Sequence, residues 1–213
     1  MSDSKSTSAH ESPRRYSHIV VVGLRGLIGA GKSTLAAAIQ LEFPNVHVRS
    51  MAGPIKKGLA EMGITKTSNL ATYRREAQRI GAMMRAEDPE WWVRLADTEL
   101  ARLNGLQQDI EAGAKRPKPP CIVIFDDIRY PNEAGLCDIL HFVRPSFEVP
   151  EPLHAGSAEG HESEEWNLAY TQGEDWGCSV NPPTTLLVNA HNKIDDGAFA
   201  IMESVRLFIR THP

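Results

Sequence analysis

The chain has 213 residues, of which 41% are hydrophobic and 23% charged, so it holds enough apolar material for a folded core, and wholesale disorder is excluded. Lys and Arg number 23 against 27 Asp and Glu, and the formal charge of −4 excludes a general polycation that would hold a nucleic-acid backbone. Three scattered cysteines without CxxC or zinc-type spacing indicate reduced thiols, which are typical of a cytoplasmic protein.

The N-terminal residues 1–17 are Ser-rich and charged and contain no apolar stretch, so we expect a flexible tail that is neither a signal peptide nor a membrane anchor. No later run approaches the roughly 20 apolar residues that a bilayer-crossing helix needs. We therefore expect a soluble protein without a membrane partner, folded as a single domain over residues 18–213.

From His18 onward, an apolar, β-branched run is followed by a glycine-rich turn and then by an Ala- and Leu-rich helix from Lys32 to Phe43. Further strands and helices alternate along the chain, with strands at 46–51, 121–126, 139–144 and 185–189 and helices at 54–62, 68–85, 89–106 and 195–211. The alternation predicts an α/β fold, in which a parallel sheet has helices on both faces and ligands gather at the carboxyl ends of the strands.

Two segments interrupt this alternation. Residues 112–120 are rich in Pro and Lys, which predicts a surface loop before the central strand. Residues 145–183 mix Pro, Gly, Ser and Glu with few aliphatic side chains, as is typical of a mobile lid or a long loop.

The glycine-rich turn, GLIGAGKS at residues 26–33, matches the phosphate-binding pattern G-x-x-x-x-G-K-[ST] in full. Its glycines let backbone N–H groups wrap the phosphates, its lysine reaches the β- and γ-phosphate oxygens, and its serine hydroxyl coordinates Mg²⁺. The positive end of the following helix points at the same anion. We expect this segment to bind ATP through Gly26, Gly29, Ala30, Gly31, Lys32, Ser33 and Thr34, with Ser33 as the metal ligand.

The apolar strand CIVIFDD ends in two carboxylates, Asp126 and Asp127. At the carboxyl end of a central strand, one or both would lie near a Mg²⁺ held by Ser33, as a phosphate-loop enzyme requires. The alternative is a strand-ending aspartate that caps the next turn.

The expected helix at 68–85 carries Arg74, Gln78, Gly81 and Arg85 at steps of four, three and four, which places them along one face. Two guanidiniums, an amide and a glycine that permits close approach suit an anionic group carried by a base. The alternative is a solvated basic face that includes the neighbouring Arg75 and Arg79.

Arg129 leaves the same strand end two residues beyond Asp127, so it can reach phosphates between a donor and an acceptor. By spacing alone, a surface salt bridge to one of the acids is an equal alternative.

Taken together, these motifs resemble a known family. The loop GLRGLIGAGKST, the following SMAGPIKKGL, the R-x-x-x-Q-x-x-G of residues 74–81 and above all FDDIRYPNEA resemble the phage deoxynucleoside monophosphate kinases. More loosely, the chain is similar to the phosphomevalonate kinases of the same P-loop kinase fold. The resemblance runs from about His18 to the final helix, through HESE at residues 161–164 and LLVN ending at Asn189.

The resemblance implies a three-layer fold like that of the nucleoside monophosphate kinases, with acceptor-binding helices over about 54–106 and a lid over about 145–183. It implies Mg²⁺ and ATP-dependent phosphorylation of a deoxynucleoside 5′-monophosphate to its diphosphate, in the host cytoplasm for a phage-encoded protein, with a homodimer left open. The residues to which it assigns a catalytic role are Lys32, Asp127 and Arg129. Beyond the phosphate loop, the expected ATP contacts are Arg144 and Asn189. The expected acceptor contacts are Lys56, Arg74, Gln78, Arg85, Trp91, Asp127, Arg129, Glu133 and Glu162.

The role of Trp91 has an alternative of its own. Trp91 and Trp92 follow the acceptor helix, and either ring could stack on a base. Two adjacent tryptophans are more often one core residue and one rim residue.

The chemistry of phosphoryl transfer, considered apart from the family resemblance, also favours a nucleotide phosphate as the acceptor. A nucleotide phosphate is mostly dianionic at pH 7, so it attacks without a general base and needs only charge screening from arginines and Mg²⁺. A kinase acting on a sugar hydroxyl would need a carboxylate base instead, and Asp127 keeps that alternative open.

The expected lid departs from the pattern of small-molecule kinases with this fold, whose lids usually supply arginines. Residues 145–192 contain no Lys or Arg and hold the acids Glu148, Glu151, Glu159, Glu162, Glu164, Glu165, Glu174 and Asp175. Arginines that clamp the phosphates must then come from elsewhere, and we expect Arg129 and Arg144.

Three other functions remain as alternatives. Residues 192–195 fit the N-K-x-D guanine-recognition pattern of a GTPase, although no D-x-x-G follows the central strand. Dephospho-coenzyme A kinase and phosphomevalonate kinase share the loop and an anionic substrate. A nucleotide-binding switch would bind ATP without turning over an acceptor.

Overall fold

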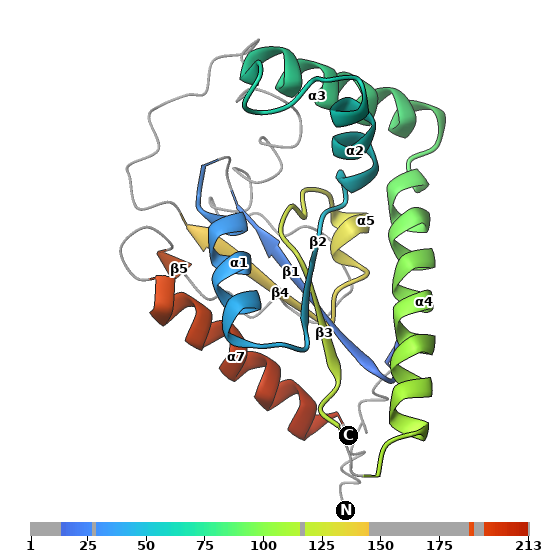
Figure 1. Cartoon of the computed structure of the whole chain (residues 1–213), viewed down its shortest axis with the longest axis vertical. Helices are drawn as coiled ribbons and strands as arrows, with labels where there is room; N and C mark the ends of the chain where they lie inside the picture. The colour runs from blue at the N-terminus through green and yellow to red at the C-terminus, as the bar shows by residue number, and fades with distance from the viewer. Residues whose placement is uncertain (1–13, 27–28, 116–117, 145–187, 190–193, 213) are drawn as a thin grey trace, which may run out of the picture.

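Parallel strands form the middle of the molecule (Figure 1). The structure is a computed structural model, and it describes residues 14–26, 29–115, 118–144, 188–189 and 194–212. Within these residues the sheet has five strands in the order β2-β3-β1-β4-β5, every neighbouring pair being parallel. The strands are β1 (Ile19–Arg25), β2 (Val46–Arg49), β3 (Cys121–Phe125), β4 (Ile139–Arg144) and β5 (Val188–Asn189). The expected parallel α/β sheet is confirmed.

The central strand β1 is buried along its whole length because both of its edges are paired and both of its faces are covered. Val22 lies in register with Ile124 of β3 on one side and Ile139 of β4 on the other. A strand enclosed in this way must be apolar at consecutive positions, which explains why the run reads IVVV rather than alternating with polar residues.

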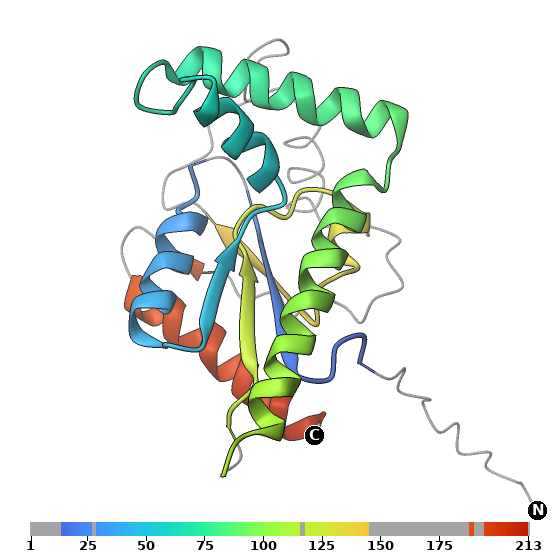
Figure 2. The same cartoon turned by 45° about the vertical axis from the view of Figure 1, so that its right-hand side comes forward.

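Helices cover both faces of the sheet (Figures 1 and 2). Helices α1 and α7 pack on one face, α4 packs on the other, and α2 and α3 lie beyond the carboxyl ends of the strands. The helices are α1 (Lys32–Glu42), α2 (Gly53–Glu61), α3 (Leu70–Glu87), α4 (Trp91–Ala112), α5 (Pro131–Ala134) and α7 (Ile194–Thr211).

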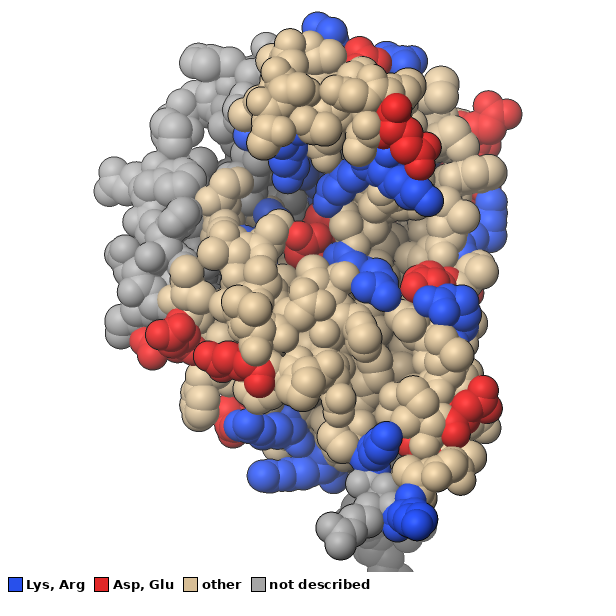
Figure 3. Space-filling view, in the orientation of Figure 1, with Lys and Arg blue, Asp and Glu red and all other residues tan. Residues whose placement is uncertain are grey.

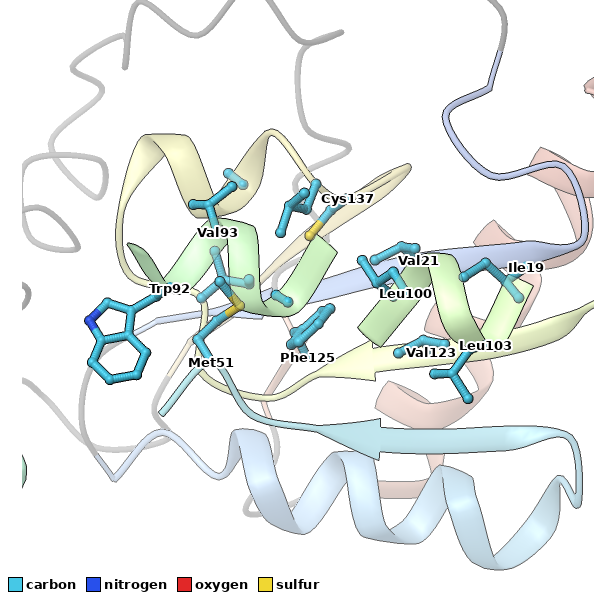
Figure 4. Packing of buried hydrophobic residues seen from close by; sticks show 14 of the residues in the cluster. Ile19, Val21, Met51, Trp92, Val93, Leu100, Leu103, Val123, Phe125 and Cys137 are labelled. Atoms are coloured by element: carbon cyan, nitrogen blue, oxygen red, sulfur yellow. The ribbon is translucent and has the colours of Figure 1, made fainter. Parts of the chain in front are cut away.

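The sheet separates two apolar cores, because successive side chains of a strand point to opposite faces. On one face Val21, Val123 and Phe125 pack against Leu100 and Leu103 of α4 (Figure 4). The other face carries the alternate residues of the same strands, which pack against α1 and α7; these residues are Val20, Val22, Leu24, Ile122 and Ile124.

Two helices have boundaries that differ from the expected ones, and local contacts explain the differences. Helix α3 starts at Leu70 because the Asn69 side chain caps it, accepting a hydrogen bond of 3.0 Å from the N–H of Thr72. Helix α4 continues six residues past the expected Leu106, and its last turn is tied down where Glu111 accepts from Gln107 at 2.9 Å and contacts His18 at 2.7 Å. The short helix α5 has no counterpart among the expected elements.

The packed part of the chain begins earlier than expected. Tyr16, which we assigned to the flexible tail, is 5% exposed and its hydroxyl donates to Asp97 of α4. Asp97 also pairs with Arg15 at 2.7 Å, and Arg14 donates to the carbonyl oxygen of Ile19 at 2.6 Å. These contacts with α4 and β1 hold residues 14–16 in place. The rest of the expected tail, residues 1–13, and the expected lid at 145–183 lie outside the described residues.

In the part of the chain that the structure describes, no helix combines the length and the apolar character that crossing a bilayer requires.

Gly23 of β1 lies where the neighbouring side chains leave no room for a Cβ. A Cβ at this position would lie 2.7 Å from both Cys137 Sγ and Leu140 Cδ1. We predict that Gly23→Ala lowers the free energy of unfolding by about 1–3 kcal/mol through overpacking. Gly105→Ala in α4, where a Cβ meets no atom within 4 Å, should raise it by about 0.5–1 kcal/mol. Chemical denaturation of both variants measures the two shifts, and a stable Gly23→Ala would contradict the packing described here.

Candidate functional site

A cavity of about 430 Å³ opens at the carboxyl ends of the strands, between the glycine-rich loop after β1 and helices α2 and α3. Figure 3 shows the hollow below α3, where basic and acidic side chains meet. In a parallel α/β sheet this edge is where ligands bind. Its lining residues come from the glycine-rich loop and α1, from α2 and α3, and from the segment that follows β3.

The glycine-rich loop needs its glycines for two different reasons. Gly31, which caps α1, has φ +88°, a left-handed conformation that side-chain-bearing residues rarely adopt. Gly26 has φ +136°, and a Cβ there would lie 2.3 Å from the carbonyl oxygen of Val143. The chain can therefore turn from β1 into α1 so that the helix begins at the cavity with its N–H groups directed toward an anion.

The structure brings the expected loop residues to this cavity. Lys32 Nζ donates to the carbonyl oxygen of Gly26 at 2.6 Å. Residues 27 and 28 lie outside the described part of the chain. The loop and α1 residues that line the cavity are Gly29, Ala30, Gly31, Lys32, Ser33 and Thr34.

Asp126 lies at the end of β3 against the start of α1. The Ser33 hydroxyl donates to its Oδ2 at 2.5 Å, and its Oδ1 is buried without a hydrogen-bond partner among the described residues. Burial, together with the charge of Asp127, raises the pKa of Asp126 above its usual range. A hydroxyl beside a carboxylate with an unsatisfied oxygen is a donor set that fits Mg²⁺, which prefers oxygen ligands and retains water and phosphate in its shell. Among the described residues there is no cluster of three or more His, Cys, Asp or Glu side chains, and a site completed by phosphates would not need one.

Asp127 contacts the turn between β2 and α2, and both of its oxygens accept hydrogen bonds. Its Oδ1 accepts from the N–H of Met51 at 2.7 Å, and its Oδ2 accepts from the N–H of Ala52 at 3.3 Å and from the Ser50 hydroxyl. Burial alone would raise the pKa of Asp127, but Lys56, 3.3 Å away, and these hydrogen bonds outweigh it and lower the pKa. Asp127 is thus an ionised anchor that joins the end of β3 to the turn between β2 and α2.

Helix α3 presents one face to the cavity. The expected set of Arg74, Gln78, Gly81 and Arg85 lines it, together with Tyr73 and Ala77. The alternative of a solvated basic face applies to the other side of the helix, where Arg75 and Arg79 pair with Glu76 at 3.3 and 2.9 Å.

The segment after β3 brings Arg129 and Tyr130 to the cavity, together with Lys56 from α2. Glu133, expected to contact the acceptor, is not among the described residues that line the cavity, and the residue is only 1% exposed. Its carboxylate pairs with Arg85 at 2.9 Å and accepts from the N–H of Arg129 at 2.8 Å.

The tryptophans do not reach the cavity lining. Trp92 is 5% exposed, packs in the core and donates from Nε1 to the carbonyl oxygen of Gly81 at 3.3 Å, while Trp91 is 36% exposed on the surface of α4. The stacking role expected for Trp91 is therefore corrected, and the one-core, one-rim alternative describes the pair. Among the described residues, the aromatic rings that line the cavity are those of Tyr73 and Tyr130.

Sequence reasoning missed Tyr73 and the apolar wall beside it. The signal was present in the spacing, because Tyr73, Ala77 and Gly81 follow one another at steps of four and so share a helix face. The other apolar residues of this wall are Ile55 and Leu70.

For three expected site residues, Arg144, Asn189 and Glu162, the structure gives only a place in a strand or no position at all. Arg144 and Asn189 are register partners at the carboxyl ends of the adjacent strands β4 and β5. Glu162 lies outside the described residues, as do Asn192 and Lys193 of the alternative guanine-recognition pattern.

No protein-family model matches this sequence, and no curated protein matches it either.

The two aspartates should respond oppositely to neutralisation. Asp127→Asn replaces an acceptor of four hydrogen bonds by an amide, so we predict a free energy of unfolding lower by about 2 kcal/mol. Asp126→Asn removes a buried charge that Asp127 repels, so the same quantity should be unchanged or higher. Urea denaturation at neutral pH measures both variants, and equal losses would show that the two carboxylates are not divided as described.

Proposed function

We propose that this protein transfers the γ-phosphoryl group of ATP to the phosphate of a deoxynucleoside 5′-monophosphate, and that it does so on a P-loop fold of the nucleoside monophosphate kinase type with a lid over about 145–183. The single observation that carries the proposal is the cavity itself. One continuous space has a phosphate-binding loop at one end and a helix face with Arg74, Gln78 and Arg85 at the other, with Asp126 at the loop.

The charge around the cavity favours two phosphorylated substrates. Its described lining carries Lys32, Lys56, Lys66, Arg74, Arg85 and Arg129, and its only described acids are Asp126 and Asp127. Bringing a nucleoside triphosphate and a monophosphate together requires screening of two polyanions, and fixed cations supply that screening without reorganisation. An uncharged acceptor would not call for this excess of positive charge.

The engagement of Asp127 favours a phosphate acceptor over a hydroxyl acceptor. A sugar hydroxyl needs a general base that readily takes up a proton, but Lys56 and the hydrogen bonds from the β2 to α2 turn lower the pKa of Asp127 and so make it a weak base. Asp126 accepts from Ser33 at the loop end of the cavity, where this proposal assigns its remaining oxygen to Mg²⁺. A dianionic phosphate needs no base, so the described residues suit it better.

In this proposal an oxygen of the acceptor phosphate attacks the γ-phosphorus, the bond to the bridging oxygen of the β-phosphate breaks, and ADP leaves with the electron pair. Lys32 binds the β- and γ-phosphates, and Arg129 lies between donor and acceptor to stabilise the charge of the transferring group. Ser33 and Asp126 would hold Mg²⁺, which neutralises phosphate charge when bound. Arg74, with Lys56, binds the acceptor phosphate.

The apolar wall accounts for the base of the acceptor. Ile55, Leu70 and Tyr73 give the cavity a mostly apolar wall, and the Gln78 amide, which lines the same cavity, can donate and accept hydrogen bonds. We assign the aromatic contact with the base to Tyr73 in place of Trp91.

The test is ADP release from Mg·ATP with the full-length protein. The acceptors are the four common deoxynucleoside monophosphates, their ribose counterparts, phosphomevalonate, dephospho-coenzyme A and no acceptor. We expect turnover with at least one deoxynucleoside monophosphate and none with Lys32→Ala. A signal with only one of the two metabolites would move the protein to a neighbouring kinase class, and acceptor-independent GTP hydrolysis would favour the GTPase alternative.

Arg74 and Arg75 form a matched pair on α3, because only the first lines the cavity. We predict that Arg74→Ala raises the KM for the monophosphate by about 10- to 100-fold and leaves the KM for ATP unchanged, since a charged hydrogen bond to the acceptor is lost. Arg75→Ala should change neither. Steady-state kinetics with each substrate varied in turn measure both constants, and a rise confined to the KM for ATP would reverse the two ends of the cavity.

A further inference from the structure

Glu133 is a buried carboxylate to which the proposed reaction gives no direct task. It lies in the short helix α5, 48 residues from its partner Arg85 at the end of α3. The contact therefore joins the acceptor helix to the segment that follows β3, two parts of the chain that are distant in sequence. Burying an ion pair is a poor way to gain stability, because the loss of hydration offsets much of the attraction.

The two oxygens of this carboxylate accept hydrogen bonds from two different parts of the chain. Oε1 accepts from Arg85 Nη2 at 2.9 Å. Oε2 accepts from the backbone N–H of Arg129 at 2.8 Å and from that of Tyr130 at 3.3 Å. One planar group thus sets the distance between the Arg85 guanidinium and the backbone that carries Arg129.

The Arg85 guanidinium is confined on further sides. Its Cζ lies 4.0 Å from the centroid of the Tyr130 ring, in a cation–π contact. A Cβ at Gly81 would lie 3.3 Å from Arg85 Nη1, so the glycine leaves room for the group. The same guanidinium lines the cavity, and with five N–H donors it can keep its bond to Glu133 while it contacts a phosphate.

We propose that Glu133 is a positioning residue for the phosphate acceptor, holding the Arg85 guanidinium and the Arg129 backbone in a fixed relation at the acceptor end of the cavity. This inference rests on the proposed function. It assigns to Glu133 an action through Arg85, not a contact with the substrate, and it explains why a glutamate stands four residues after Arg129, within reach of that residue's own N–H.

The test is a double-mutant cycle on Glu133→Gln and Arg85→Ala, with initial rates measured as the monophosphate and ATP are varied in turn. The amide oxygen of glutamine still accepts from the backbone N–H groups of Arg129 and Tyr130, so this substitution removes only the charged interaction with Arg85. We expect Glu133→Gln to raise the KM for the monophosphate by about tenfold without changing the KM for ATP, because a charge-assisted hydrogen bond is lost. In the Arg85→Ala background the same substitution should change it by less than about twofold, because no guanidinium is left to position.

Effects that multiply in the double variant would overturn the inference, because Glu133 would then act on the substrate or on the fold independently of Arg85. Glu76→Gln is the matched control, since Glu76 pairs with Arg75 and Arg79 on the same helix and lies outside the described lining. It should leave both KM values unchanged. If Glu133→Gln does not fold, Arg85→Lys replaces it: the ion pair persists but the planar group is lost, so the KM for the monophosphate should still rise. An unchanged KM in that variant would overturn the inference.

Calorimetry in the absence of ATP gives the dissociation constants of the monophosphates for the wild-type protein, the two single variants and the double variant. This second double-mutant cycle does not need turnover, so it separates this inference from the proposed function. Turnover by the wild-type protein with a multiplicative cycle would refute only the role of Glu133. Binding with a non-additive cycle but without turnover would refute the kinase reaction and retain the positioning role. Absence of both binding and turnover would refute both.

Discussion

The arrangement of the cavity depends on one carboxylate, that of Asp127. It accepts hydrogen bonds from the N–H groups of Met51 and Ala52 and from Ser50, and it faces Lys56 at 3.3 Å. These contacts join the end of β3 to the turn that opens α2, and α3 packs on α2. The placement of the arginine-bearing face of α3 relative to the glycine-rich loop therefore depends on a largely buried anion that its donors keep ionised.

Asp126 and Asp127 show how neighbouring residues of one type acquire different tasks. Successive residues at a strand end point to opposite sides, so Asp126 meets Ser33 at the loop while Asp127 meets the β2 to α2 turn. Their pKa values shift in opposite directions, that of Asp126 upward through burial and its neighbour's charge, and that of Asp127 downward through Lys56 and its hydrogen bonds. The carboxylate that retains an unsatisfied oxygen is the one beside the glycine-rich loop, where the proposed function requires a cation.

The cations around the cavity are held by two kinds of support. Lys56 and Arg85 each pair with a carboxylate, Asp127 and Glu133 respectively, which limits their mobility. Each of these carboxylates also accepts hydrogen bonds from backbone N–H groups, so each cation is held in place relative to the main chain. Such fixed cations can stabilise charge during phosphoryl transfer without first reorganising, which is the property that the proposed function requires.

The sequence by itself determined the parallel α/β sheet, the glycine-rich loop before α1, the strand ending in two aspartates and the helix face shared by Arg74, Gln78, Gly81 and Arg85. These features follow from backbone geometry and residue periodicity, which are local. Tertiary structure alone decided that Trp91 lies outside the cavity, that Glu133 binds Arg85, and that Tyr16 packs on α4. Those outcomes depend on contacts between segments distant along the chain, and no periodicity within one segment records which distant partner will cover a given side chain.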